Sequence, residues 1–387
     1  MGENRNCETE MTGEGMAARS DGTEEVDLRY EYWMASLYRI HDNRRRQAGL
    51  ISGGAAKLYG FSEKEMRKLH YFTEDEIHYI CESRKTFDPE REWERLQRTK
   101  IRFLPFTHEE YPEKLRHIYD PPYALYVKGR LPDPGGKSVA VVGARACSEY
   151  GRSVARLLGK TLAEHGVAVI SGLAVGIDSA SHAGALSAEG DTFAVLGCGC
   201  DVCYPRSSVN LYENIVSGRG GILSELSPGT QPLPHFFPRR NRIISALSDL
   251  VIVVEAKKRS GSLITADCAI EQGKDVFAVP GRFRDSLSEG CNHLIEQGAG
   301  ILYDIENFLK NTGIVSETEI IEKKLDKLSL AKEERLVYSN LDFNPKFIDM
   351  IIEETGLNLL TVLHTLDILK KKQLVQESFQ NYFCKKL

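Results

Sequence analysis

The amino-acid sequence from residue 137 to residue 312 predicts an α/β fold, a doubly wound and mostly parallel sheet with helices on both faces. The first observation is that SVAVVGA (138–144) and LVIVV (250–254) are continuously apolar, as strands buried on both faces are. The second is that such runs alternate with stretches of helical spacing, for example GRSVARLLGKTLAEHG (151–166). The third is that most runs end in small residues, where ligand-binding loops begin in sheets of this kind.

The elements of this sheet follow one another in a regular order along the chain. Strands are expected at 138–144, 167–172, 192–197, 221–226, 249–256 and 275–281, with helices at 151–166, 177–190, 208–218, 240–248 and 263–273. A helix between two strands is the usual connection of a parallel sheet. The predicted α/β domain therefore accounts for residues 137–312.

Residues 29–85 are predicted to form a small helical domain. Two hydroxyl residues precede helical stretches and are followed three residues later by a glutamate, which is the spacing of a capping box: Ser62 with Glu65, and Thr73 with Glu76. The segment resembles a helix-hairpin-helix or SAM-like domain. A packing domain that binds no ligand explains it equally well.

The N-terminal segment, residues 1–28, is expected to be a disordered acidic tail. Residues 1–29 contain eight acidic and three basic residues, an imbalance equal to the net charge of −5 of the whole chain. Low hydrophobicity with high net charge is typical of disordered segments. The remaining chain is neutral overall, so its ability to bind an anion depends on where its basic residues cluster.

Three further segments complete the expected organisation. Residues 86–136 are predicted to be a connector packed on the α/β domain, with short strands in IRFLPF and YALYVKGRL, and residues 313–328 a charged linker. Residues 329–387 show the order helix, helix, helix, hairpin, which resembles a winged helix. Winged helices bind DNA or mediate protein contacts, and both roles stay open because the third helix is apolar up to Lys370.

The composition indicates a cytoplasmic protein. No apolar run approaches the roughly 20 residues of a membrane helix, and the N-terminus lacks the apolar region of a secretory signal. The nine cysteines do not pair evenly, and a chain of 387 residues needs no disulfide framework. We therefore expect a reduced compartment and no membrane partner.

The loop after the first strand of the α/β domain carries Gly143, Ala144 and Arg145. It departs from G-x-G-x-x-G, because Arg145 stands where the backbone would approach a pyrophosphate. A dinucleotide is therefore disfavoured, and we expect no cofactor. An arginine beside a helix N-terminus suits a phosphate oxygen, but a structural ion pair explains Arg145 equally well.

Two basic clusters flank the strand LVIVV, RRNR at 239–242 and KKR at 257–259. The segment SGS at 260–262 then opens a helix with hydroxyl and free N–H groups, which is a further anion site. The pair FF at 236–237 offers ring faces. Bases, helix N-termini and aromatic rings together suit a single-stranded nucleic acid, which has several phosphates in a row and unstacked bases.

Two other groups of residues are candidates for acid–base catalysis and for metal binding. Asp178 and His182 are spaced i, i+4 and could act as an acid–base pair, although such a pair more often pins its own helix. Cys198, Cys200 and Cys203 have C-x-C-x-x-C spacing, but no second cysteine pair or histidine cluster lies nearby. A structural zinc site needs four ligands, so no metal is expected.

Eight ordered motifs resemble the DNA-processing protein A (DprA/Smf) family over residues 137–305, namely VGAR, SGLAVGIDSASHAGAL, LGCGCDVCYP, SELSPG, FPRRNRII, VVEAKKRSGSLITA, VFAVPG and GCNHLIEQGA. The resemblance implies a cytoplasmic homodimer that binds single-stranded DNA in a Rossmann-like domain. It also implies protection of incoming DNA and loading of the RecA recombinase in natural transformation. The residues at matching motif positions, implied to bind DNA, are Arg145, Gly172, Phe237, Arg240, Asn241, Arg242, Lys257, Ser260, Gly261 and Ser262.

The sequence departs from the family pattern after the Tyr-Pro pair at 204–205. Ser208 and Asn210 stand where the family usually has Asn and Lys. Arg206 can supply a positive charge there. This edge of the expected groove is therefore the part that the resemblance supports least.

The alternative class is an enzyme, a Rossmann-like nucleotide phosphoribohydrolase. Such enzymes use a P-G-G-x-G-T-x-x-E element, whereas this chain has SGSLITADCAIE at the comparable place, with Glu271 far along the helix. Glu225 and Glu255 end predicted strands but are equally suited to pairing with nearby arginines. The sequence therefore favours a binding protein without enzymatic activity.

Overall fold

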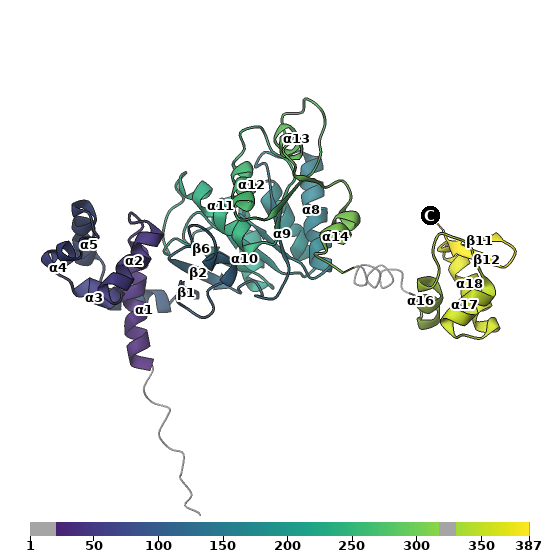
Figure 1. The fold of residues 1–387 in the computed structure, drawn as a ribbon, viewed down its shortest axis with the longest axis horizontal. Helices are drawn as coiled ribbons and strands as arrows, with labels where there is room; N and C mark the ends of the chain where they lie inside the picture. Colours follow the sequence, from purple (N-terminus) through teal and green to yellow (C-terminus); the bar gives the residue numbers. More distant parts are fainter. Residues whose placement is uncertain (1–20, 317–329, 387) are drawn as a thin grey trace, which may run out of the picture. The chain divides into compact units, whose positions relative to one another are not determined.

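Nine strands of the described chain form one sheet in the order β1-β2-β6-β5-β4-β3-β7-β8-β9. Figure 1 shows the edge strands β1, β2 and β6 next to one another. The computed structural model describes residues 21–316 and 330–386. Strands β3 to β9 pair in parallel, whereas β1 with β2 and β2 with β6 pair antiparallel. The strands are β1 Ile101–Pro105, β2 Ala124–Gly129, β3 Ser138–Val142, β4 Ala168–Ser171, β5 Thr192–Val195, β6 Gly221–Ser224, β7 Leu250–Val253, β8 Asp275–Ala278 and β9 Gly300–Ile301.

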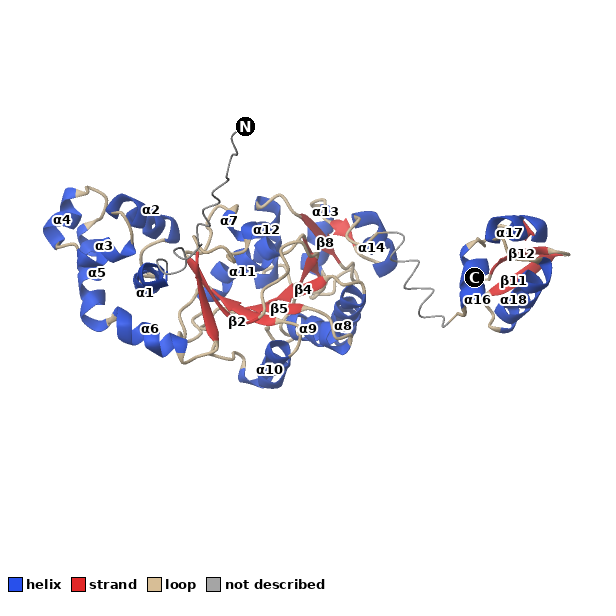
Figure 2. Cartoon of the chain, turned by 90° about the horizontal axis from the view of Figure 1, so that it is seen from below, coloured by secondary structure: helices blue, strands red, loops and turns tan. Residues whose placement is uncertain are grey.

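Helices cover both faces of the parallel part of the sheet. Figure 2 shows α8, α9 and α10 on one face and α11, α12 and α13 on the other. The central strands β3 and β7 are buried along their whole length, as their apolar sequences predict. The expected α/β sheet is confirmed, and its helices are α8 Glu149–Glu164, α9 Ile177–Ser187, α10 Val209–Ser217, α11 Phe236–Leu247, α12 Gly261–Glu271 and α13 Glu289–Glu296.

The segment expected to be a connector belongs to the sheet itself. Strand β2 pairs with β6 from Tyr126 opposite Ser224 to Gly129 opposite Gly221. Strand β1 then extends the antiparallel edge, and the short helix α7 (Glu113–Arg116) lies between the two strands in sequence. The boundary placed at residue 137 is therefore too late, because the pairing joins strands almost a hundred residues apart and no local pattern reports it.

The N-terminal helical domain consists of six helices and extends beyond the expected residues 29–85. Both predicted capping boxes are present, at Ser62 with Glu65 and at Thr73 with Glu76. Asp88 caps one further helix, α6, by accepting from the backbone N–H groups of the first turn. The helices are α1 Asp21–Ser36, α2 Asp42–Ser52, α3 Ala55–Gly60, α4 Glu63–Lys68, α5 Glu74–Thr86 and α6 Pro89–Gln97.

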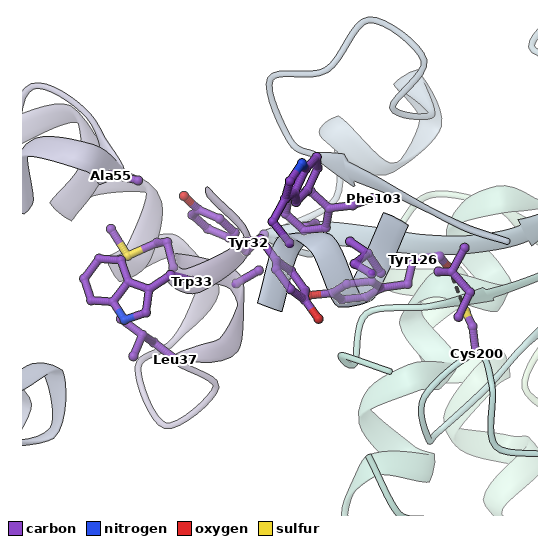
Figure 3. Packing of buried hydrophobic residues seen from close by; sticks show 14 of the residues in the cluster. Tyr32, Trp33, Leu37, Ala55, Phe103, Tyr126 and Cys200 are labelled. Atoms are coloured by element: carbon purple, nitrogen blue, oxygen red, sulfur yellow. Dashed lines mark hydrogen bonds between the residues drawn. The ribbon is translucent and has the colours of Figure 1, made fainter. Parts of the chain in front are cut away.

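The helical domain and the antiparallel edge of the sheet share one hydrophobic core (Figure 3). The Tyr32 ring of α1 lies 5.4 Å from the Phe103 ring of β1 and 6.0 Å from the Tyr126 ring of β2, measured between centroids. On the far side of β2, the Cys200 thiol donates to the Tyr126 carbonyl. Because the core is continuous from α1 to the sheet, the two parts fold as one body.

The second compact unit comprises Glu306–Leu387. Its elements are α14 (Ile305–Thr312, which begins at the division), α16 Lys332–Ser339, β10 Lys346–Phe347, α17 Ile348–Thr355, α18 Leu359–Lys371, β11 Val375–Phe379 and β12 Tyr382–Lys385. Strands β10, β12 and β11 form a small antiparallel sheet in that order. The expected succession of three helices and a hairpin is present, with one additional short strand, and the winged-helix assignment stays a prediction.

Two expected segments fall largely outside the described residues. The predicted tail is described only from residue 21, where α1 already begins, so residues 21–28 are helical rather than part of a tail. Acidic composition misled here, because glutamate is also a good helix former. Most of the linker expected at 313–328 lies outside the described part. In that part, no helix is both long and apolar enough to cross a membrane.

Candidate functional site

The cleft of interest opens at the carboxyl ends of β3 and β7, where the strand order reverses. The loop after β3 leads to α8 and β4 on one side, and the loop after β7 leads to α12 and β8 on the other. Open α/β sheets bind ligands at such a switch point. The cleft has a volume of about 560 Å³ and is lined by residues of both loops and of α11.

The loop that carries Arg145 is held against the neighbouring strand. The Ala144 N–H donates to the Glu255 carbonyl at 2.7 Å, and the Glu255 carboxylate accepts from the N–H of Ser148 at 2.8 Å and from its hydroxyl. Glu255 therefore anchors the start of α8. The Arg145 side chain stays exposed, and its guanidinium carbon lies 5.3 Å from the centre of the Phe237 ring.

Arg240 lies buried beneath the cleft and fixes the role of Gly172. Its Nη1 donates to the Gly172 carbonyl at 3.0 Å and to the Val195 carbonyl. A Cβ on residue 172 would come within 2.5 Å of the Arg240 guanidinium, so glycine makes room for this arginine. Burial lowers the pKa of Arg240 to about 10, although the nearby Asp178 opposes the shift.

The start of α12 forms the opposite wall of the cleft. The Ser260 hydroxyl caps the helix by accepting from the Ser262 N–H at 3.4 Å and also lies 2.8 Å from the Ser262 hydroxyl. Asn241 donates from its amide to the Gly261 carbonyl at 3.0 Å, which links α11 to α12. Lys257, in the preceding loop, is exposed and also lines the cleft.

The charge of the cleft is positive. Its described lining includes four cationic side chains and one acidic side chain, Arg145, Arg240, Lys257 and Arg259 against Asp178. Asp178 is buried and accepts from the Gly172 N–H at 3.1 Å. Burial raises its pKa, which disfavours the charged carboxylate. An anion entering this cleft therefore meets positive charge with little opposing negative charge.

The two neighbouring phenylalanines have different environments. Phe236 is buried, whereas Phe237 is half-buried and lines the cleft. The Tyr204 ring lies 5.6 Å from the Phe237 ring at an interplanar angle of 40°, and it is partly exposed at the same cleft. We did not single out Tyr204 from the sequence, although the YP pair in the quoted motif was a signal for it.

Arg242 does not belong to the cleft, contrary to the expectation from the motif. It lies on the other face of α11 and makes a two-pronged ion pair with Glu225, with Nη1 to Oε1 at 2.9 Å and Nη2 to Oε2 at 2.7 Å. Its Nε also donates to the Asp120 carbonyl at 2.9 Å. The four consecutive polar residues 239–242 were expected to form one cluster. Because they lie on a helix, their side chains point from different faces of it.

Asp178 and His182 do not form an acid–base pair in the cleft. The His182 Nδ1 lies 2.7 Å from the Thr192 hydroxyl in the core, and burial lowers the pKa of His182 to about 3. Asp178 instead bonds the backbone of the preceding loop. Both side chains pin α9 to the sheet, which is the role that their spacing favoured.

The cysteine motif follows β5, and its first two cysteines pack in the protein interior. Cys198 and Cys200 are buried and donate to the backbone carbonyls of Val202 and Tyr126. In the described residues, no group of three or more His, Cys, Asp or Glu side chains is arranged to hold a metal ion. Ser208 and Asn210, the departures from the family pattern, are absent from the described lining of the cleft.

The chain is similar to known proteins over most of its α/β part. The family model described as DNA recombination-mediator protein A matches residues 102–313. DNA processing protein DprA of Streptococcus pneumoniae is 49% identical over 193 residues, which cover 50% of this chain and 67% of that protein. Protein Smf of Escherichia coli is 38% identical over 284 residues, which cover 73% of this chain and 70% of that protein.

A solved structure agrees with these sequence relatives. The X-ray structure of DNA processing protein A from Streptococcus pneumoniae aligns with a TM-score of 0.64 and 36% identity, over 73% of this chain and 96% of that chain. The family match begins at residue 102, so it includes the antiparallel strands β1 and β2 as well as the parallel sheet. The chain therefore belongs to the DprA/Smf family of DNA recombination-mediator proteins.

Proposed function

We propose that this protein binds single-stranded DNA in the cleft at the ends of β3 and β7, as a stoichiometric binding protein rather than an enzyme. The observation that carries the proposal is the lining of the cleft. Exposed cations from two loops, Arg145 and Lys257, line the same cleft as the half-buried ring of Phe237, and the Arg145 guanidinium carbon lies 5.3 Å from the centre of that ring. Phosphates would contact the cations, and a base would stack on the ring.

A single strand fits this arrangement better than a duplex or a free nucleotide. A duplex keeps its bases stacked, so the Phe237 ring would have no base face to contact. A mononucleotide would use only one of the anion sites, whereas the cationic side chains of the cleft come from three separate elements, the two loops and α11. We expect little preference for base sequence, because stacking and phosphate contacts do not read base edges.

Membership of the family supports further proposals about partners. We propose that the protein forms a homodimer in the cytoplasm, protects incoming DNA and loads RecA onto it during natural transformation. The relative in Streptococcus pneumoniae is named DNA processing protein DprA, and the relative in Escherichia coli is named protein Smf. We also propose that the second unit works as a winged helix.

The proposal that the protein is not an enzyme is supported by the contacts of the carboxylates near the cleft. Glu225 is paired with Arg242, and Glu255 holds the Ser148 N–H and hydroxyl. Asp178 is buried against the loop after β4. A phosphoribohydrolase needs a carboxylate aimed at the ribosyl bond, and all three of these carboxylates already have structural partners.

Polarisation binding of labelled oligo(dT), with duplex DNA and mononucleotides as competitors, tests the binding proposal. We expect tight binding of the single strand, weak competition by duplex, and strong weakening with salt. Incubation with AMP, CMP and ATP, followed by detection of released base or phosphate, tests the proposal that there is no turnover. Release of base or phosphate from any of these nucleotides by the purified protein would overturn the proposal that it is not an enzyme.

A further inference from the structure

Asp42, the first residue of α2, is a buried carboxylate surrounded by arginines. Its side chain is 1% exposed. Among the described residues, Arg45 of the same helix and Arg239 and Arg242 of α11 form ion pairs with it. These arginines hold the pKa of Asp42 below its usual value despite the opposing effect of burial. Two of the three partners are about two hundred residues away in sequence, so Asp42 ties the helical domain to α11.

The arginines of α11 also bind carboxylates of the sheet and its loops. Arg242 pairs with Glu225 just after β6, and Arg239 lies 3.3 Å from the same carboxylate. The Asp120 carboxylate, before β2, lies 3.4 Å from the Arg242 Nε. We call this group, Asp42, Asp120, Glu225, Arg239 and Arg242, the clamp.

The clamp lies on the helix that also carries cleft residues. Phe237, Arg240 and Asn241 of α11 line the cleft, whereas Arg239 and Arg242 point to the clamp. Both sets come from the first two turns of the helix, with i, i+3 or i, i+4 spacing within each set, so each set occupies its own face. A shift of these turns away from the clamp would displace the cleft residues by a similar amount.

The two ends of α11 are held by different means. At the C-terminal end, Lys274 donates from Nζ to the Ser245 carbonyl at 2.8 Å and to the Ala246 carbonyl at 2.6 Å. At the N-terminal end, His235 occupies the cap position without a side-chain hydrogen bond to the helix. The position of the first turns therefore depends on other contacts, and the buried ion pairs of Arg239 and Arg242 in the clamp are among them.

We propose that Asp42 is a positioning residue for DNA binding: through Arg239 and Arg242 it holds the first turns of α11 so that Phe237 and Arg240 face the cleft. The inference rests on the proposed function, because it assigns the helical domain a role in the same site. It makes that domain more than a packing module, since its buried carboxylate sets the geometry of one wall of the DNA cleft.

A double-mutant cycle in the full-length protein tests this role. The variants are Asp42→Asn, Phe237→Ala and Lys257→Ala, alone and in pairs, with oligo(dT) affinity measured well below each melting temperature. Asp42→Asn should weaken binding by roughly 5- to 150-fold, the range for losing one stacked base. When Asp42→Asn is added to Phe237→Ala, the oligo(dT) affinity should fall little further, because Phe237→Ala has already removed the stacked base. Lys257 lies in the loop after β7 and not on α11. In the double variant Asp42→Asn, Lys257→Ala the two fold-losses of oligo(dT) affinity should therefore multiply.

A matched control is Glu74→Gln, which removes an exposed ion pair with Arg67 in the same helical domain. It should leave oligo(dT) affinity unchanged. Should Asp42→Asn fail to fold, Arg239→Gln weakens the clamp while Arg242 keeps its pair with Glu225, and the same cycle applies to it. Unchanged affinity in the folded Asp42 or Arg239 variant, or losses that multiply with Phe237→Ala, would overturn the inference. A wild-type protein that does not bind oligo(dT) would instead overturn the proposed function.

Discussion

Arg240 and Arg242 stand two positions apart on α11 and have different surroundings. Arg240 lies beneath the cleft, where it donates to two backbone carbonyls and to the Asn241 side-chain oxygen. The nearby carboxylate, Asp178, has a raised pKa. Arg242 lies in the clamp, where Glu225 and Asp42 neutralise it. The comparison teaches that a basic motif predicts positive charge only where the fold supplies no carboxylate opposite it.

The same distinction separates the loop cations from the clamp. Arg145 and Lys257 are exposed and line the cleft, so their charge is available to a phosphate. The clamp arginines are at most about a quarter exposed and lie against Asp42, Asp120 and Glu225. A chain whose body is neutral overall can therefore present a positive site, because exposed cations line the cleft while the carboxylates of Asp42, Asp120 and Glu225 lie at the clamp.

The largest expected effect comes from removing Arg242. Arg242→Ala leaves the carboxylates of Glu225 and Asp42 with fewer partners in a buried environment, and breaking a buried pair in this way costs about 3–5 kcal/mol in the free energy of unfolding. Urea unfolding measures this loss. Lys258→Ala, at an exposed position beside the cleft, is the control and should change stability by less than about 0.5 kcal/mol. Equal stability of the two variants would show that the clamp is not a stabilising network.

The sequence predicted the parallel sheet and the capping boxes well because both depend on local patterns. The run LVIVV and the Ser62–Glu65 spacing carry their own signals, and both occur as expected. The antiparallel edge and the clamp depend on partners that are distant in sequence. Arg242 was assigned to the cleft because its motif neighbours Arg240 and Asn241 are there, and nothing near it in sequence indicates Asp42.

The cleft itself was partly predictable for the same reason. Loops at the carboxyl ends of strands converge in any doubly wound sheet, so Arg145 and the start of α12 were expected to come together. The role of Gly172 was not predictable, since the close approach is made by Arg240 rather than by a ligand. Tyr204 reaches the Phe237 ring through a loop whose path has no regular pattern.

The second expected effect contrasts two adjacent rings. Phe237→Ala should weaken oligo(dT) binding by about 1–3 kcal/mol if a base stacks on this ring, with a small change in Tm. Phe236→Ala should lower Tm strongly, because Phe236 is buried, and should leave the affinity of the folded fraction nearly unchanged. Melting curves and polarisation measured on the same preparations separate the two cases. A large loss of Tm with unchanged binding in Phe237→Ala would assign this ring to the core.

The smallest expected effect concerns the salt dependence of binding and isolates a single charge. Each phosphate neutralised contributes about −0.7 to the slope of log K against log salt concentration for single strands. Arg145 is exposed at the cleft with its guanidinium near the Phe237 ring, so Arg145→Ala should weaken binding and make the slope less steep by about 0.7. Arg67→Ala, an exposed cation paired with Glu74 in the helical domain, should leave the slope as it is. An Arg145 variant with the wild-type slope would remove this side chain from the phosphate path, and the availability of cleft cations to DNA would then depend on Lys257 and Arg259.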